Sequence, residues 1–194
     1  RVVLLGPAHR VAFDGCALPR ADAFRTPLGE VAVDTEARTV LAGMPGVVVD
    51  DRPHAHEHSL EVQLPFLQRV LPSFTLVPLV VGRCPAGTVA HLIGAVWGGA
   101  ETVVLVSSDL SHYEEYRSAA RHDAQTAASI VEYASGAIGP YDACGAYPLR
   151  GLLEVAREHA LVPAVLDVRS SGDTAGTTDR VVGYGSFALA GASR

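Results

Sequence analysis

The sequence predicts an α/β fold with a mixed, largely parallel central sheet that is flanked by helices on both faces. Residues 74–82 and 102–106 are almost uninterrupted apolar runs, the pattern of strands that are covered on both faces. Residues 86–97 between them have the composition of a crossover helix, and this order predicts a parallel pair with a right-handed connection. In such sheets, ligands gather at the carboxyl ends of the strands.

Shorter patterns predict the remaining elements. Residues 2–5 form a buried strand that ends at Gly6-Pro7 and delivers His9 to a strand end. Leu60, Leu64 and Leu67 give one apolar face at helical period, and we expect Pro65 to kink or interrupt that helix. We also expect a hairpin or irregular stretch at residues 13–34, with a strand at 31–33. In the C-terminal half we expect helices at 119–133 and 144–159, strands at 161–168 and 180–190, and a surface loop at 170–179.

Length and charge restrict the class of protein. A chain of 194 residues suits a single domain, residues 1–194. The net charge of −6 and the complete lack of lysine argue against a nucleic-acid partner. No apolar run approaches the ~20 residues of a membrane span, and no basic region followed by an apolar run opens the sequence, so we expect a soluble protein without a signal peptide. The three cysteines form no C-x-x-C pair, so we expect a reducing compartment, the cytoplasm. Because the sequence opens inside a predicted strand, we expect a further N-terminal segment before it.

Two histidines follow predicted strand ends. These are His9 and His112, and a histidine in such a place is either a solvated loop residue or a ligand. His54, His56 and His58 alternate along the chain, so an extended segment would place all three on one side. Neutral imidazole binds zinc, copper, iron and nickel. For His54 and His56 we favour the alternative of a polar loop without ligand function.

Cys144 precedes a predicted amphipathic helix. A helix N-terminus carries partial positive charge, which lowers a thiol pKa and favours the thiolate that binds metal or attacks carbon. The alternative is a small buried cysteine that fills a packing gap, a role that suits Cys16 and Cys84 better. Of the three cysteines, Cys144 therefore fits a ligand or nucleophile better than the other two.

Asp109 lies three residues before His112 and could orient its imidazole. The alternative role for Asp109 is an N-cap of the following segment. The sequence contains no G-x-S-x-G elbow, Walker loop or G-x-G-x-x-G motif, so it gives no support to a serine hydrolase or a nucleotide-binding protein.

Six stretches, in order along the chain, resemble the Memo family, the middle member of the AmmeMemoRadiSam gene neighbourhood. They are Gly6-Pro7-Ala8-His9, Phe24-Arg25-Thr26-Pro27-Leu28-Gly29, Glu57-His58-Ser59-Leu60-Glu61-Val62-Gln63-Leu64-Pro65, Ser107-Ser108-Asp109-Leu110-Ser111-His112, Cys144-Gly145, and Ser171-Gly172-Asp173 with Val181-Val182-Gly183-Tyr184. The resemblance implies a fold like that of the class III extradiol dioxygenases, which hold non-haem Fe(II).

The resemblance also implies roles for individual residues. His9 and His58 are expected as metal ligands, Cys144 takes the position where the dioxygenases have a carboxylate, and His112 matches their acid–base histidine with Asp109 behind it. Fe(II) is the expected metal, and a thiolate ligand shifts the preference toward zinc or copper. The family also has an upstream segment that ends in a Pro-His-Ala-Gly-Tyr type stretch, which does not occur here.

Three functions are compatible with these residues. The leading hypothesis is an iron-dependent redox enzyme that acts on a small phenolic or chelating substrate, or on such a group of a partner protein. The second is a phosphopeptide-binding module, which the dispersed arginines and the lack of lysine disfavour. The third is a zinc hydrolase with His112 as general base. The gene neighbourhood implies radical SAM and AMMECR-type partner proteins.

Overall fold

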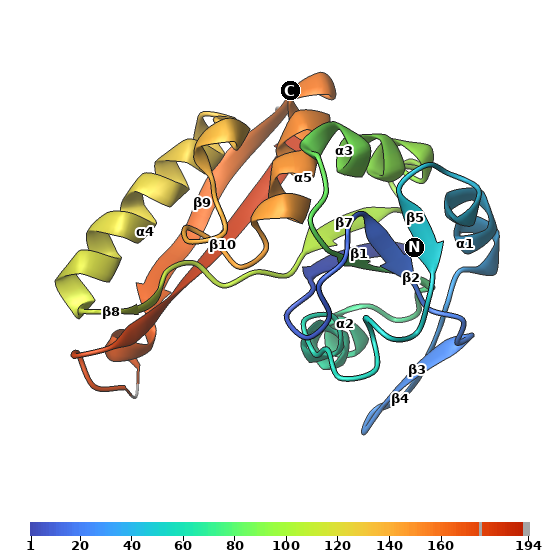
Figure 1. Ribbon diagram of the computed structural model, residues 1–194, viewed down its shortest axis with the longest axis horizontal. Coiled ribbons are helices and arrows are strands. Elements are labelled where there is room, and N and C mark those ends of the chain that lie inside the picture. Colours follow the sequence, from blue (N-terminus) through green and yellow to red (C-terminus); the bar gives the residue numbers. More distant parts are fainter. Residues whose placement is uncertain (175, 192–194) are drawn as a thin grey trace. The chain divides into compact units, whose positions relative to one another are not determined.

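The computed structural model describes residues 1–174 and 176–191, and it confirms the predicted α/β class. Figure 1 shows the helices and strands in chain order. The chain divides into two compact units, Arg1–Ser107 and Ser108–Arg194. No helix in the described ranges is both long and apolar enough to cross a membrane.

The first unit contains a five-stranded sheet in the order β5-β2-β6-β1-β7. Its strands are β1 (Val2–Pro7), β2 (Cys16–Leu18), β5 (Val47–Val49), β6 (Leu76–Val81) and β7 (Val103–Val106). Strand β1 is parallel to β6 and β7, whereas β2 is parallel to β5 and antiparallel to β6. The sheet is therefore mixed and largely parallel, as predicted.

One detail of the predicted topology is wrong. Strands β6 and β7 are parallel but they are not neighbours, because β1 lies between them. Every residue of β1 and β6 is buried, whereas β7 forms an end of the sheet and Val103 is half exposed. The almost uninterrupted apolar run at residues 102–106 suggested a strand covered on both faces, but apolar composition does not distinguish a central strand from an edge strand.

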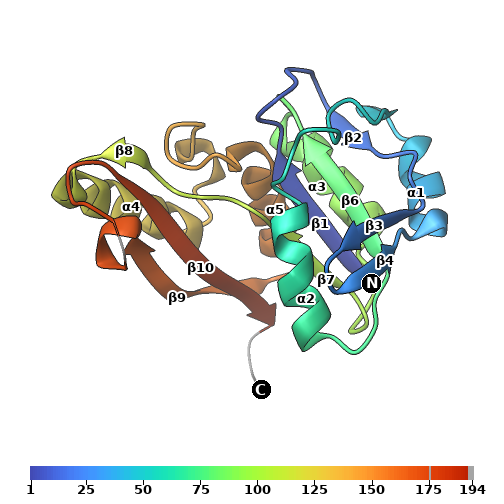
Figure 2. The same ribbon diagram turned by 90° about the horizontal axis from the view of Figure 1, so that it is seen from below.

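Helices cover both faces of this sheet, as expected. Figures 1 and 2 show α2 (Leu64–Val70) and α3 (Ala86–Ala95) on opposite faces. Val2 and Leu4 of β1 pack in one buried cluster with Leu60 and Leu64, which places the start of α2 against one side of the strand. The alternation of side chains along a strand directs the intervening residues to the other face.

Several shorter elements complete the first unit. Strands β3 (Ala23–Thr26) and β4 (Gly29–Ala32) form the hairpin that was one predicted alternative. Helix α1 (Thr35–Ala42) was not predicted, although Asp34 caps its N-terminus by accepting a hydrogen bond from Ala37 N. The 3-10 turn η1 (Glu61–Gln63) leads into α2, and Pro65 lies in the first turn of α2. Pro65 thus begins a helix instead of interrupting one, because the first turn needs no amide donor there.

The second unit is built on an antiparallel three-stranded sheet in the order β8-β10-β9. Its elements are β8 (His112–Glu114), α4 (Tyr116–Val131), η2 (Ser135–Ala137), α5 (Ala146–Glu158), β9 (Leu161–Ser170), η3 (Ser171–Asp173) and β10 (Val181–Gly191). Helix α4 contacts β9 and β10. All predicted helices and long strands of this unit are present, whereas β8 and the short turns η2 and η3 were not expected.

Candidate functional site

The predicted site residues come from both units. His9 and His58 belong to the first unit, and Asp109, His112 and Cys144 belong to the second. The convergence of His9, His58 and Cys144 on one metal ion therefore stays a prediction. Within the described residues of either unit, no group of three or more His, Cys, Asp or Glu side chains is arranged to hold a metal ion.

In the first unit, the segment that carries His58 lies directly against the end of β1. A Cβ atom at Gly6 would come within 2.7 Å of Ser59 Oγ and 2.9 Å of Leu60 Cδ2, so glycine permits this close approach. Ser59 Oγ donates a hydrogen bond of 2.9 Å to the carbonyl oxygen of Pro7. The Gly-Pro-Ala-His and Glu-His-Ser stretches are therefore neighbours in space.

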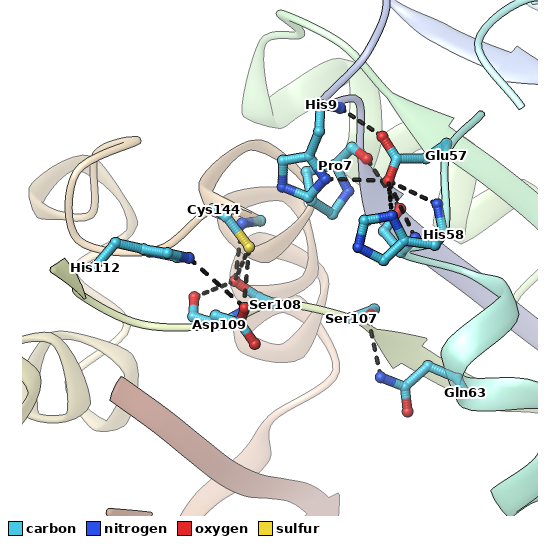
Figure 3. Close-up of polar contacts among 12 residues, drawn as sticks. Pro7, His9, Glu57, His58, Gln63, Ser107, Ser108, Asp109, His112 and Cys144 are labelled. Atoms are coloured by element: carbon cyan, nitrogen blue, oxygen red, sulfur yellow. Dashed lines mark hydrogen bonds and ion pairs between the residues drawn. The ribbon is translucent and has the colours of Figure 1, made fainter. Parts of the chain in front are cut away.

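The carboxylate of Glu57 connects these two stretches (Figure 3). One oxygen accepts the backbone N–H of His9 at 2.5 Å, and the other lies 3.1 Å from His9 Nδ1. The second oxygen also accepts the backbone N–H groups of His58 at 2.9 Å and Ser59 at 3.1 Å. We call Glu57, His9, His58 and Ser59 the Glu57 cluster.

These contacts determine the charge of Glu57. Burial by itself would raise the pKa of this carboxyl group, but the hydrogen bonds from His9, His58 and Ser59 outweigh burial and lower the pKa to about 2. The group is therefore an anion at neutral pH. A buried anion beside His9 Nδ1 favours the tautomer that carries its proton on Nδ1, which leaves Nε2 with a free lone pair.

The two imidazoles of the Glu57 cluster lie side by side. Their ring centroids are 6.2 Å apart with an interplanar angle of 27°. His58 Nδ1 is 3.8 Å from the same carboxylate oxygen that His9 Nδ1 contacts. Both rings therefore turn Nδ1 toward Glu57, and both side chains are partly exposed, at 39% for His9 and 63% for His58. The arrangement presents two Nε2 atoms that can bind a metal.

The other two histidines of the His-rich segment do not join this cluster. The segment forms successive turns, with His54 N bonded to Asp51 O and Glu57 N bonded to His54 O, so the alternate positions do not share one side. His54 is buried and its Nε2 lies 3.0 Å from the carbonyl oxygen of Ala17. His56 is exposed. His56 therefore fits an exposed polar loop, whereas His54 is a buried residue of these turns, and the lack of a ligand function stays a prediction for both.

In the second unit, Cys144 is tied to the stretch that follows β7. Cys144 Sγ accepts the backbone N–H of Asp109 at 3.1 Å, and Cys144 N donates to Asp109 O at 3.2 Å (Figure 3). Ser108 Oγ accepts the N–H of Gly145 at 2.8 Å and lies 3.7 Å from the sulfur. The sequence neighbours Ser108 and Asp109 thus hold the thiol from two sides.

The expected effect of the helix on Cys144 is not found. Helix α5 begins at Ala146, and Cys144 lies just before it, yet burial raises the pKa of the thiol above its ordinary value. The hydrogen bonds from Asp109, Ser108 and Gly145 act in the opposite direction and are too weak to offset burial. In the metal-free protein the sulfur is therefore a thiol, and a bound cation would be needed to favour the thiolate.

His112 and Asp109 are paired, as the three-residue spacing predicted. His112 Nε2 lies 3.6 Å from Asp109 Oδ2, and both side chains are partly exposed. The next residue, Tyr113, has a left-handed backbone with φ of 61°, and its ring stands edge-on to His112 with centroids 5.7 Å apart. A non-glycine residue in this conformation carries backbone strain, which is common next to functional groups.

Sequence reasoning missed the role of Glu57. Glu57 appeared only as part of the Glu-His-Ser stretch and was given no function of its own. The available signal was an acidic residue beside a candidate ligand, because a carboxylate is the usual partner of a metal-binding imidazole. Cys16 and Cys84 are buried, as expected, and their sulfur atoms lie 3.9 Å apart.

Known proteins resemble this chain over most of its length. A family model described as Memo-like protein matches residues 1–188. A MEMO1 family protein of Aeropyrum pernix is 37% identical over 196 residues, which cover 94% of this chain and 70% of that protein. MEMO1 family proteins of Methanopyrus kandleri and Sulfolobus acidocaldarius are 36% and 34% identical to this chain. Each alignment covers 94% of this chain, and it covers 70% of the Methanopyrus protein and 69% of the Sulfolobus protein.

Proposed function

Because the chain belongs to the Memo-like protein family, we propose that it is a metal-dependent redox enzyme in which His9, His58 and Cys144 hold one non-haem iron ion. The observation that carries this proposal is the Glu57 cluster. A buried carboxylate that engages Nδ1 of one imidazole and lies beside Nδ1 of the next is the arrangement that orients histidine ligands in metal sites.

The chemistry of the donor atoms fits a transition metal. The first unit offers two imidazole nitrogens, and the second offers a sulfur that is already held by the N–H of Asp109. Imidazole suits iron, zinc and copper, and thiolate adds affinity for zinc, copper(I) and iron. Two histidines and one thiolate leave coordination positions for a substrate, as two histidines and a carboxylate do in non-haem iron enzymes. Fe(II) is our proposal for the metal, with zinc or copper as the competing ions.

A metal held there would supply Lewis-acid and redox chemistry to a chelating substrate. His112 accepts a proton from a hydroxyl group of the substrate and later returns it, which is the usual role of a histidine in general acid–base catalysis. Asp109 at 3.6 Å stabilises the imidazolium that forms. The substrate class that fits these groups is a small phenol or another chelating molecule, or such a group of a partner protein.

We further propose the relationship to class III extradiol dioxygenases, and an association with radical SAM and AMMECR-type proteins. Both proposals are supported by the sequence motifs.

Anaerobic purification followed by elemental analysis tests the proposed function. We expect about one iron per chain, and iron content should fall in His9→Ala, His58→Ala and Cys144→Ala but not in the control His91→Ala, which replaces an exposed histidine of α3. Zinc at about the same ratio would favour the hydrolase. A chain that retains no metal and binds none when it is added would contradict the proposal and favour the peptide-binding module.

A further inference from the structure

A second histidine of the second unit lies between two carboxylates. His122, on α4, has Nδ1 2.6 Å from Glu114 Oε1 and Nε2 2.7 Å from Asp142 Oδ1. We call His122, Glu114 and Asp142 the His122 cluster. Only 23% of the His122 side chain is exposed. Both ring nitrogens are engaged, so this imidazole has no lone pair left for a metal.

The protonation of His122 follows from these contacts. A carboxylate at each ring nitrogen can accept a hydrogen bond only if that nitrogen carries a proton, and the ring with two N–H groups is the imidazolium. The hydrogen bonds to Asp142 and Glu114 raise the pKa of His122 above its ordinary value, in spite of partial burial. Charge-assisted hydrogen bonds of this length are among the stronger polar contacts in proteins.

The two carboxylates belong to segments that carry proposed functional residues. Glu114 is the last residue of β8, the strand that begins with His112, and its second oxygen accepts the hydroxyl of Ser118 at 2.8 Å. Asp142 lies two residues before Cys144. Its second oxygen accepts the N–H of Gly139 at 2.5 Å and closes the loop that leads to Cys144.

We propose that His122 is a positioning residue that joins the strand of His112 to the loop of Cys144 and thereby fixes the placement of both residues within the second unit. The inference rests on the proposed metal site for the roles of Cys144 and His112. The bridge acts from a distance, since His122 touches neither residue in the contacts described above. The Cys144 sulfur is held directly by Asp109 N–H and Ser108, and the bridge determines where the loop presents that sulfur.

Two measurements on His122→Gln test the proposal. The first is the rate at which iodoacetamide alkylates Cys144 in the metal-free protein at one fixed pH, followed by peptide mass spectrometry that separates Cys144 from Cys16 and Cys84. Glutamine cannot bridge both carboxylates as a cation, so the loop should shift and the rate should change severalfold. The second is titration with Co(II) alone, in which the sulfur-to-cobalt absorption band should weaken and the affinity should fall by about 10- to 100-fold, the usual effect of losing a group that orients ligands.

Controls separate positioning from general destabilisation. His91→Gln changes an exposed histidine of α3 in the other unit and should match the wild type in both measurements. Asp142→Asn removes one arm of the bridge, and in combination with His122→Gln its effect should be less than additive. Asp142→Asn also serves as the primary variant should His122→Gln fail to fold.

The proposal is overturned if His122→Gln, or Asp142→Asn in its place, lowers the melting temperature while the alkylation rate and the cobalt spectrum stay as in the wild type. If wild-type protein shows no sulfur-to-cobalt band, the proposed metal site is wrong, and the alkylation rates alone then decide whether His122 positions Cys144.

Discussion

The Glu57 cluster of the first unit and the His122 cluster of the second combine the same two kinds of side chain in opposite ways. In the Glu57 cluster, one buried carboxylate is the centre and two partly exposed imidazoles surround it. In the His122 cluster, one imidazole is the centre and two carboxylates surround it. The first arrangement leaves an Nε2 atom on each ring available to a metal, whereas the second uses both nitrogens of its ring. A histidine cluster can therefore present ligands to a metal only where its imidazoles keep a free nitrogen, and the presence of histidine alone does not indicate a ligand site.

The largest effect is expected for His112, which belongs to neither cluster and lies 3.6 Å from Asp109. His112→Ala should lower turnover by roughly 10²- to 10⁴-fold, the usual contribution of an acid–base group. Oxygen uptake with catechol as the probe substrate measures this, and elemental analysis should give unchanged metal content. A parallel loss of metal would instead identify His112 as a ligand.

Substitution of Cys144 should change both the affinity and the choice of metal. Cys144→Ser should weaken binding, because a hydroxyl is far less acidic than a thiol and is a poorer ligand for these ions. Cys144→Asp restores two histidines and one carboxylate, so Fe(II) binding should survive while the preference for zinc and copper falls. Competition titrations with the three metals measure this. Unchanged affinity and selectivity in both variants would exclude Cys144 from the site.

Removing the charge of Glu57 tests whether the first cluster presents its imidazoles. Glu57→Gln keeps the shape of the side chain but places an amide where an anion accepts four N–H groups. Metal affinity should fall by about 10- to 100-fold. Glu36→Gln, at an exposed position of α1, is the matched control. Equal affinities of these two variants, measured by titration, would mean that Glu57 has only a structural role.

The smallest effect concerns the pH dependence of stability in the second cluster. Because the pKa of His122 is raised on folding from about 6.5, its contribution to stability is fully present below about pH 6.5 and is lost as the pH rises through the raised folded value. Urea unfolding of wild type and His122→Gln should therefore show a stability difference that shrinks with rising pH across this window. A difference that is constant or grows with pH would contradict the bridged imidazolium.

Much of the architecture could be predicted because it depends on local patterns. The apolar runs of β1 and β6 and the helical periods of α4 and α5 located those elements to within a few residues. Strands β2 and β5 have three residues each, which is too few for a periodic signal. The sequence signal for helix α1 was the N-cap residue Asp34. The position of β1 between β6 and β7 depends on long-range pairing that no local pattern contains.

The sequence supplied the candidate site residues, whose joint metal site stays a prediction, but it did not supply the contacts that surround them. The pairing of Asp109 with His112 followed from their spacing, since both residues lie on one short stretch. The roles of Glu57 and His122 depend on contacts between segments far apart in the chain, such as Glu57 with His9 and His122 with Asp142. The raised pKa of Cys144 has the same origin, because burial is a property of the folded unit and not of the helix that follows.

X-ray absorption spectroscopy of the metal-loaded protein tests the central claim, that His9, His58 and Cys144 bind the same ion. With zinc as the probe metal, we predict one sulfur neighbour at about 2.3 Å and imidazole nitrogens at about 2.0–2.1 Å. The sulfur contribution should vanish in Cys144→Ser, and the imidazole contribution should decrease in His9→Ala and in His58→Ala. A wild-type spectrum without sulfur, or a sulfur signal that persists in Cys144→Ser, would contradict the account.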